Sequence, residues 1–280
     1  MRKYLAVLLL LCALTAFLWW ENCTVETETV EIALPALPQA FDGLRLVVIA
    51  DLHGRSFGNE NEDLLAAVRD AAPDLICMVG DVFDAEVPIS YLRALCVGLR
   101  AIAPTCFVTG NHEWQARDLR STLRDMEAWG VEVLRDGHFV MERGRSRIAV
   151  AGVDDPCGPL ERKSAAAVMA AARREADFVC VLSHRNDELP KWAALDADLV
   201  LSGHCHGGIV RLPFLGGVFG ADRSLFPDFD AGLYRQADTC LYVSRGLGFS
   251  RIPFRLFNRP HLPVLILRCK QSVNNSWENL

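Results

Sequence analysis

The 280-residue sequence contains no run of five or more basic residues, and its net charge at pH 7 is −6. Because sequence-independent binding of nucleic acid needs clustered Lys and Arg, no nucleic-acid partner is expected. An anionic substrate must therefore be attracted locally, by a few groups at one site.

The sequence also lacks a Cys-X-X-Cys pair, although it contains ten cysteines. At this length the chain is too long to be a small scaffold stapled by disulfides. Half of the cysteines lie in apolar, strand-like runs, where an unpaired Cys behaves as a small buried hydrophobe. We predict core thiols at Cys77, Cys106, Cys180, Cys240 and Cys269.

No basic residue occurs between Lys3 and Arg45, and residues 4–20 form an uncharged apolar run. A helix needs about 17 such residues to span a bilayer. We predict a transmembrane anchor over residues 1–20, with a cleaved signal peptide as the alternative. Because Arg2 and Lys3 precede the span, the positive-inside tendency predicts a single-pass protein of the cell membrane whose bulk lies outside the cytoplasm.

Beyond the anchor, residues 21–40 are acidic and Pro-bearing, and we interpret them as a stalk and first edge strand. A single domain is predicted over residues 41–270, followed by a polar tail over residues 271–280. Within the domain, short runs rich in Val and Ile alternate with helical patterns, which predicts a parallel-rich sheet. Hairpin-like pieces at residues 131–151 predict a second, mixed sheet, with helices on both outer faces.

These patterns place each expected element by residue number. Helices are expected at 61–72, 90–101, 115–129, 161–176 and 187–195, and strands at 44–50, 75–79, 105–109, 131–134, 138–142, 147–151, 178–182 and 199–201.

Five short polar segments each follow an apolar strand-like run, and they hold five of the seven histidines. In open α/β sheets, ligand sites lie beyond the carboxyl ends of the strands, so we expect these segments to meet. They are Asp51-Leu52-His53, Gly80-Asp81, Gly110-Asn111-His112-Glu113, Ser183-His184 and Gly203-His204-Cys205-His206.

Carboxylates, an Asn oxygen and several imidazoles together suit Mn, Fe or Zn, whereas Mg and Ca prefer oxygen ligands alone. The candidate ligands are too many for one tetrahedral ion. They fit two divalent ions about 3.5–4 Å apart that share a carboxylate, an arrangement used for displacement at phosphorus.

The order of these motifs resembles the calcineurin-like metallophosphoesterases, and the resemblance covers residues 41–268. Residues 243–248 and 252–255 also resemble the membrane-associated bacterial branch of that family. The resemblance implies an α/β fold, a four-layer α/β/β/α sandwich with two mixed sheets, here preceded by a transmembrane helix.

The resemblance further implies a role for each residue. Asp51, His53, Asp81 and His206 would hold one metal ion, and Asp81, Asn111, His184 and His204 the other, with Asp81 bridging. His112 would be catalytic: it would contact a phosphoryl oxygen or protonate the leaving alkoxide while a metal-bridging hydroxide attacks phosphorus. Cys205 stands where the family commonly has a small hydroxyl residue, and a passive role is expected for it.

Several other residues leave alternatives open. Asp84 and Glu113 are either acceptors that orient ligand histidines or solvated turn carboxylates. Arg245 and Arg255 either neutralise a substrate phosphate or serve in packing. His138 and His261 are expected to be structural or on the surface. The apolar residues 212–215 are expected to form a buried connector, with a membrane or acyl-chain contact as the alternative.

The function expected is a dimetal-dependent phosphoester hydrolase, a phosphodiesterase whose substrate lies at or near the membrane and is lipid-linked in one interpretation. One alternative is a pyrophosphatase of a nucleotide-linked lipid precursor, which needs a cytoplasmic active site. The other is a non-enzymatic metal-binding membrane protein, which predicts the loss of a ligand, whereas all of the ligands are present. No oligomeric state is predicted.

Overall fold

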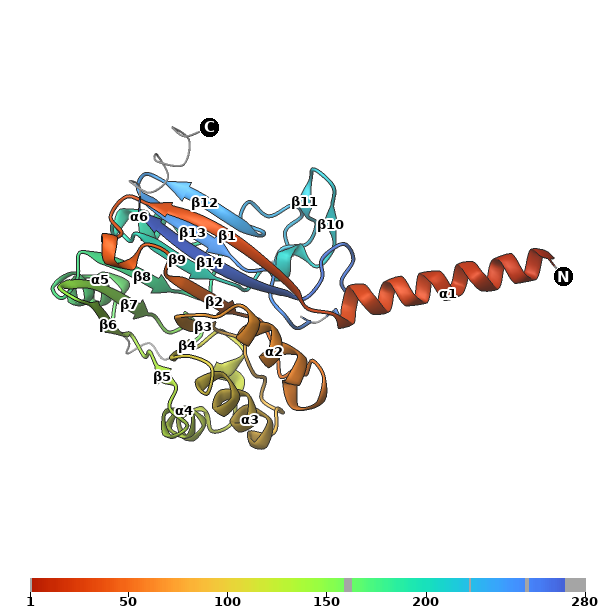
Figure 1. Ribbon diagram of the computed structural model, residues 1–280, viewed down its shortest axis with the longest axis horizontal. Helices are drawn as coiled ribbons and strands as arrows, with labels where there is room; N and C mark the ends of the chain where they lie inside the picture. Colours follow the sequence, from red (N-terminus) through yellow and green to blue (C-terminus); the bar gives the residue numbers. More distant parts are fainter. Residues whose placement is uncertain (1, 159–162, 222, 250–251, 270–280) are drawn as a thin grey trace.

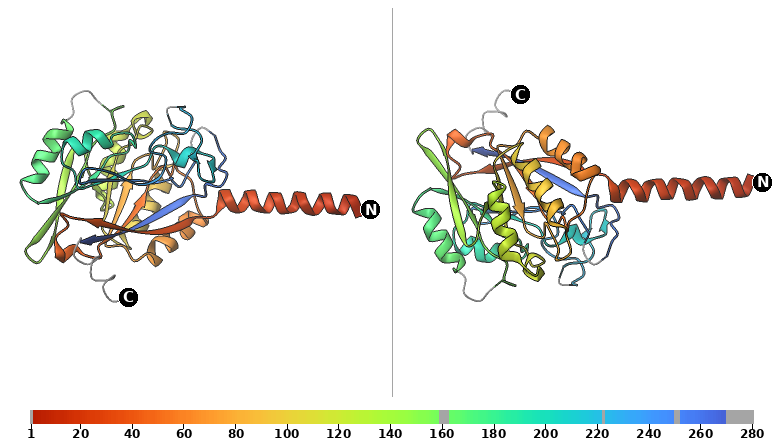
Figure 2. Two further views of the ribbon diagram at one scale, coloured as in Figure 1. Left: turned by 90° about the horizontal axis from the view of Figure 1, so that it is seen from above. Right: turned by 90° about the horizontal axis from the view of Figure 1, so that it is seen from below.

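A computed structural model describes residues 2–158, 163–221, 223–249 and 252–269. Helix α1 (Arg2–Cys23) projects from a layered domain in which two six-stranded sheets pack face to face (Figures 1 and 2). The polar tail predicted at residues 271–280 lies outside the described residues.

The first sheet contains both the first and the last described strand of the chain. Its order is β1 (Glu26–Leu34), β14 (His261–Cys269), β2 (Arg45–Ile49), β3 (Leu75–Val79), β4 (Thr105–Val108) and β5 (Glu132–Val133). Strands β2 to β5 run parallel, β14 is antiparallel to β2, and β1 pairs in parallel with β14 at the edge. The strand that follows α1 therefore lies beside the last described strand of the chain.

The second sheet has a parallel centre and antiparallel edges. Its order is β12 (Gly232–Gln236), β13 (Thr239–Val243), β9 (Leu199–Ser202), β8 (Phe178–Leu182), β7 (Ser146–Gly152) and β6 (Gly137–Arg143). Strands β13, β9, β8 and β7 are parallel, whereas β12 and β6 are each antiparallel to their neighbour. The mixed second sheet predicted from the hairpin-like pieces is confirmed.

Helices cover the outer face of each sheet. Those on the first sheet are α2 (Glu62–Asp70), α3 (Ile89–Arg100) and α4 (Leu119–Ala128), and those on the second are α5 (Ala165–Arg173) and α6 (Leu189–Ala194). Short 3-10 turns lie at η1 (Gln39–Phe41), η2 (Asn59–Asn61), η3 (Glu113–Gln115) and η4 (His206–Gly208). The predicted four-layer α/β/β/α architecture is confirmed.

The side chains of β2 show why its run is apolar without interruption. Leu46 and Val48 pack between the two sheets, while Val47 and Ile49 pack against the helices, and all four are buried. A strand covered on both faces needs apolar residues at every position. The predicted core thiols are also confirmed, because the structure buries Cys77, Cys106, Cys180, Cys240 and Cys269.

Helix α1 contains 22 residues, is almost wholly exposed, and is long and apolar enough to cross a membrane. A signal sequence would pass the same test. Only Thr24 and Val25 separate α1 from β1. Strand β1 lies within the segment 21–40, for which a stalk and first edge strand were predicted. The domain boundaries at residues 20 and 40 stay predictions.

The prediction of a buried connector over residues 212–215 is wrong. This segment forms the tip of a two-stranded hairpin, β10 (Arg211–Leu212) and β11 (Gly216–Gly217), which belongs to neither large sheet. Phe214 is fully exposed and Leu215 is 64% exposed. The hairpin stands at the end of the domain from which α1 projects (Figures 1 and 2), and among the described residues none covers its tip.

Candidate metal centre

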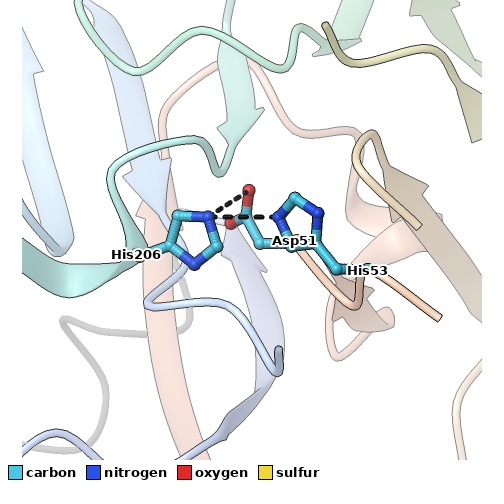
Figure 3. A group of neighbouring side chains, drawn as sticks. All are labelled: Asp51, His53 and His206. Carbon is cyan, nitrogen blue, oxygen red and sulfur yellow. Dashed lines mark hydrogen bonds and ion pairs between the residues drawn. The ribbon is translucent and has the colours of Figure 1, made fainter. Parts of the chain in front are cut away.

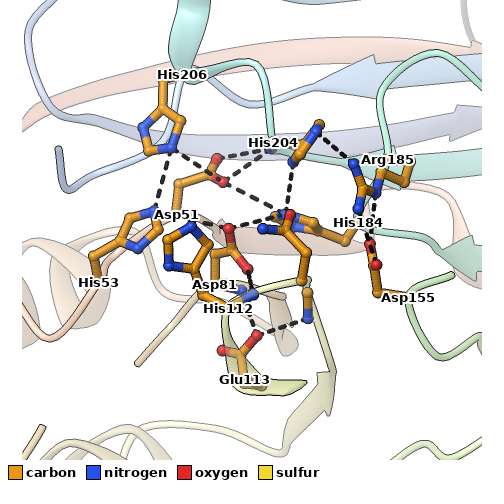
Figure 4. A network of polar contacts seen from close by, with 12 residues as sticks. Asp51, His53, Asp81, His112, Glu113, Asp155, His184, Arg185, His204 and His206 are labelled. Atoms are coloured by element: carbon orange, nitrogen blue, oxygen red, sulfur yellow. Dashed lines mark hydrogen bonds and ion pairs between the residues drawn. The ribbon is translucent and has the colours of Figure 1, made fainter. Parts of the chain in front are cut away.

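The five polar segments meet at the carboxyl ends of five strands. Asp51 and His53 follow β2, Asp81 follows β3, Asn111 and His112 follow β4, His184 follows β8, and His204 and His206 follow β9. Strands β2 to β4 belong to one sheet and β8 and β9 to the other. The site therefore lies where the two sheets end together, and Figure 4 shows the side chains converging there.

One group of ligand-type side chains consists of Asp51, His53 and His206, whose nearest atoms all lie within 4.8 Å of one another (Figure 3). The Nε2 atoms of His53 and His206 are 3.2 Å apart. Asp51 Oδ1 lies 3.8 Å from His206 Nε2. A carboxylate and two imidazoles thus face one point.

A second group consists of Asp81, His184 and His204, again within 4.8 Å. His184 Nε2 lies 3.2 Å from His204 Nδ1 and 3.2 Å from Asp81 Oδ2. The same Asp81 oxygen is 3.8 Å from His53 Nε2 in the first group. Asp81 therefore lies between the two groups, as a bridging carboxylate must.

Asn111 supplies the best test of whether metal ions fit. Its side-chain oxygen Oδ1 is buried and has no hydrogen-bond partner among the described residues. A buried oxygen without a partner is costly, and a divalent cation beside it would remove that cost. Together with the imidazole nitrogens that face each other in both groups, this donor set fits two divalent cations.

The backbone at the site is strained. Positive φ values, which non-glycine residues rarely adopt, occur at most of the predicted ligands, and such strain is typical of functional sites. These residues are Asp51, His53, Asp81, His204 and His206.

Two glycines allow the loops to approach the carboxylates closely. A Cβ at Gly110 would lie 2.3 Å from Asp81 Oδ1, and one at Gly203 would lie 2.6 Å from Asp51 Oδ2. Any side chain at either position would displace a carboxylate, so the glycines of these two motifs have a steric role at the site.

Asp84 orients two histidines. Its Oδ1 lies 2.9 Å from His53 Nδ1 and 2.8 Å from His112 Nδ1. Such a contact fixes the orientation of an imidazole ring and directs its other nitrogen elsewhere. Of the two interpretations left open for Asp84, the structure supports the orienting one.

Glu113 fits neither interpretation left open for it. Its side chain is fully buried and accepts hydrogen bonds from the backbone N–H groups of Asp81, Val82 and Gly110. Burial, followed by the charge of Asp81, raises the pKa of Glu113 to about 7. Glu113 therefore holds the loop after β3 to the loop after β4, instead of orienting a histidine.

Burial and neighbouring charges shift the pKa values of the groups at the centre in different directions. Burial lowers the pKa of His184, but Asp81 and Asp51 outweigh burial and raise it to about 10. For His204, burial and then the charges of His184 and Arg185 lower the pKa to about 3. Burial opposes ionisation of Asp81, yet His184 and His53 hold its pKa well below the usual range.

His112 is less buried than the ligand candidates, with a side chain 31% exposed. Its ring meets the His53 ring edge-on, with centroids 4.6 Å apart. The hydrogen bond that His112 donates to Asp84 is the main cause of a raised pKa at His112, so the protonated form is favoured.

Sequence analysis missed Arg185 and Asp155. Arg185 Nη1 lies 2.8 Å from His204 Nε2, and its Nε and Nη2 donate to the two oxygens of Asp155 at 2.7 and 3.0 Å. Both side chains belong to the network in Figure 4. The signal was present, because Arg185 directly follows His184 and Asp155 closely follows β7, a strand of the same sheet.

The remaining arginines and histidines have structural contacts. Arg255 is buried and donates to the backbone carbonyls of Gly248 and Arg245, and Arg245 Nη2 lies 2.9 Å from Glu26. These contacts favour packing over phosphate binding. The expectation for the two remaining histidines is confirmed: His261 is buried against Glu28, and His138 contacts Glu175.

A cavity of about 560 Å³ opens from the centre. Its polar wall includes Asp81, Asn111, His112 and His204, and its apolar wall includes Ile209, Phe219 and Ile252. Cys205 also lines the cavity, and burial raises the pKa of its thiol to about 12. The thiol therefore stays protonated, in agreement with a passive role.

Comparison with known proteins agrees with this geometry. The profile of the calcineurin-like phosphoesterase family matches residues 44–208, a range that contains every predicted ligand and His112. The chain belongs to this family. It is a phosphoric ester hydrolase of the metallophosphoesterase class, and its clustered Asp and His side chains provide sites for divalent metal ions.

Curated relatives include bacterial and animal proteins. A Bacillus subtilis protein, "Uncharacterized metallophosphoesterase YkuE", is 28% identical over 89% of this chain and 87% of its own length. The Escherichia coli "Phosphodiesterase YaeI" is 27% identical over 80% of this chain and 82% of its own. A Danio rerio "Transmembrane protein with metallophosphoesterase domain" is 28% identical over 93% of this chain, which spans only 62% of that protein.

Proposed function

We propose that this chain is a membrane-anchored dimetal phosphodiesterase whose substrate lies at or near the bilayer. The observation that carries the proposal is the position of Asp81, whose Oδ2 lies 3.2 Å from His184 and 3.8 Å from His53 and so can serve both ligand groups. The name of the Escherichia coli relative supports a diester as substrate.

The proposal assigns the ligands as two sets that share Asp81. Asp51, His53, Asp81 and His206 hold one ion, and Asp81, Asn111, His184 and His204 the other. When bound, the ions would polarise the phosphoryl group and lower the pKa of the attacking water. The mixture of carboxylate, amide and imidazole ligands favours Mn, Fe or Zn.

His112 is the proposed catalytic residue. Asp84 fixes its Nδ1, which leaves Nε2 to act on the substrate in the cavity that His112 lines. From there the imidazole donates a proton to the leaving alkoxide or a hydrogen bond to a phosphoryl oxygen. Its raised pKa suits a proton donor.

Helix α1 is the proposed anchor, and the domain is placed outside the cytoplasm. The exposed apolar surface of α1 suits surrounding lipid. Arg2 and Lys3 precede the span, whereas no basic residue follows it before Arg45, and this charge difference favours a domain outside the cytoplasm. If the helix is an anchor and not a cleaved signal, the mass of the mature protein includes residues 1–20.

The test uses full-length protein stripped with a chelator and then supplied with Mn, Fe, Zn or Mg. We expect Mn, Fe or Zn to restore hydrolysis of phosphodiesters better than Mg does, and diesters to react faster than monoesters. Hydrolysis of lipid pyrophosphates alone would support the pyrophosphatase alternative and contradict the proposal.

A further inference from the structure

Helix α1 is held firmly against the domain. Asn22 Oδ1 accepts from the backbone N–H of Arg255 at 2.7 Å, and Asn22 Nδ2 donates to the carbonyl of the same residue at 3.1 Å. The guanidinium of Arg259 lies 4.4 Å from the centre of the Trp20 ring. Because only Thr24 and Val25 separate α1 from β1, the direction of the helix fixes which face of the domain meets a membrane.

That face carries exposed apolar side chains, which we name the apolar rim: Phe214, Leu215, Phe219, Ile252 and Phe257. Their exposed fractions are 107%, 64%, 41%, 48% and 54% in that order. Phe214 and Leu215 form the hairpin tip between β10 and β11, at the α1 end of the domain (Figures 1 and 2).

The apolar rim is continuous with α1 and with the metal centre. The ring of Phe257 lies 6.0 Å from that of Phe17 in α1. The base of the hairpin is tied to the same loop, because Arg211 N donates to the carbonyl of Leu256 at 3.0 Å. Phe219 and Ile252 line the cavity that contains His112 and His204.

A lipid bilayer is the partner that matches this surface. Exposing large apolar side chains to water at a hairpin tip costs about 25 cal/mol of free energy for each Å² of apolar area. Here they adjoin an apolar helix whose paired Trp19 and Trp20 suit the membrane–water interface. Arg259 lies beside Trp20, and a cation next to an interfacial Trp suits the phosphates of lipid headgroups.

We propose that the apolar rim is a second membrane-contact surface, which inserts into the lipid interface and holds the mouth of the metal-centre cavity at the bilayer. The cavity then presents its apolar wall to lipid tails and its polar wall to a phosphate. A phospholipid-like diester could enter without leaving the membrane. This substrate class rests on the proposed function, whereas the contact itself does not.

The contact is tested with full-length protein in vesicles of phosphatidylcholine and phosphatidylglycerol that contain a phospholipid with a photoactivatable acyl chain. After irradiation, peptide mapping should find lipid adducts on residues 212–215 and on Phe257, in addition to α1. Adducts confined to α1 would overturn the proposal. So would a dimer in detergent that the hairpin variant below converts to monomer, because the rim would then be covered by a second copy.

The consequence for activity is tested with Phe214→Ser/Leu215→Ser, and Val97→Ser, an exposed apolar residue on α3, is the matched control. Removing two apolar anchors should lower hydrolysis of a phosphodiester lipid in vesicles by about tenfold, since the docked population falls. Hydrolysis of a soluble chromogenic diester should stay unchanged, and the control should change neither.

The outcomes separate this proposal from the one before it. Equal loss on both substrates would show that the hairpin supports the fold, and unchanged vesicle activity would show that it does not dock; either overturns the apolar rim as a working surface. If wild-type protein with metal hydrolyses no diester at all, the proposed function fails, and the lipid adducts still decide the membrane contact.

Discussion

Asp81 is the residue on which the proposed dimetal arrangement depends most. Its carboxylate lies between the two histidine groups, and its Oδ1 also accepts from the backbone N–H of His112 at 2.9 Å. An amide in its place keeps the size of the side chain but loses the charge that could be shared by two cations.

We expect Asp81→Asn to lower the content of both metal ions and to reduce kcat/KM by about 100-fold or more. Metal analysis of the purified protein, together with diester assays, checks this. Glu142→Gln, which alters an exposed ion pair with Arg147, is the control. Two tightly bound ions with near-normal turnover in Asp81→Asn would contradict the bridging role.

A substitution of His112 distinguishes the loss of proton donation from the loss of metal binding. Because its Nδ1 is bound to Asp84, its proposed role uses the other ring nitrogen. We expect His112→Ala to keep its metal content while kcat falls by about 10²–10⁴-fold. The loss should shrink for nitrophenyl esters, whose leaving group needs no proton. Equal losses for alkyl and nitrophenyl esters would favour a purely electrostatic role.

Gly203 tests the steric argument for the motif glycines. A methyl group there would lie 2.6 Å from Asp51 Oδ2. We expect Gly203→Ala to move the Asp51 carboxylate and to weaken metal affinity by about 10–100-fold. Titration of the chelator-stripped protein with metal measures this. Gly137→Ala is the control for the loss of a glycine, because the φ of Gly137 is not positive and a Cβ there would meet only the carbonyl oxygen of Arg135, at 3.8 Å.

At the scale of elements, the loops after β9 and β13 are tied together by a buried guanidinium. Arg255 donates to the carbonyls of Gly248 and Arg245, and its Nη2 lies 3.5 Å from His206 Nδ1. Burial lowers the pKa of Arg255 to about 9, which is still high enough to keep it charged at neutral pH. The loop that contacts α1 through Asn22 thus also packs behind a predicted ligand.

We expect Arg255→Met to destabilise the domain by about 3 kcal/mol or more, because buried carbonyls would lose their donor. Metal affinity should fall as well, since His206 loses its neighbour. Thermal unfolding and metal titration measure these effects. Arg268→Met, which removes a surface ion pair with Glu31, should cost less than about 1 kcal/mol. Equal effects of the two changes would refute the structural role of Arg255.

At the scale of the whole molecule, an exposed cysteine reports the orientation of the domain. Cys157 is exposed, whereas Cys77, Cys106 and Cys180 lie in the core. If the domain is outside the cytoplasm, a membrane-impermeant maleimide should label Cys157 in right-side-out vesicles. Peptide mapping distinguishes this site from cysteines in α1, and Cys157→Ser is the control. Labelling of Cys157 only in inside-out vesicles would reverse the topology and favour the pyrophosphatase alternative.

Much of the fold could be predicted because its elements are defined locally. The strands at 75–79 and 178–182 agree with β3 and β8 residue for residue, and the predicted helix at 90–101 differs from α3 by one residue at each end. Apolar runs covered on both faces and helical spacing are properties of neighbouring residues, so they can be read along the chain. The helix predicted at 115–129 begins later, at Leu119, because Asp118 caps its N-terminus by accepting from the backbone N–H of Ser121.

The candidate residues of the site could also be predicted from the sequence, because each motif directly follows a strand and parallel strands end at a common edge. The contacts around these residues, by contrast, depend on how distant segments pack together. Glu113 binds backbone groups more than 30 positions earlier in the chain, and Arg185 reaches Asp155 and His204 from different loops. The exposure of Phe214 and the insertion of β14 between β1 and β2 were decided in the same way. These contacts depend on which distant segments lie opposite one another, and a local sequence pattern does not identify the distant segment that it will contact.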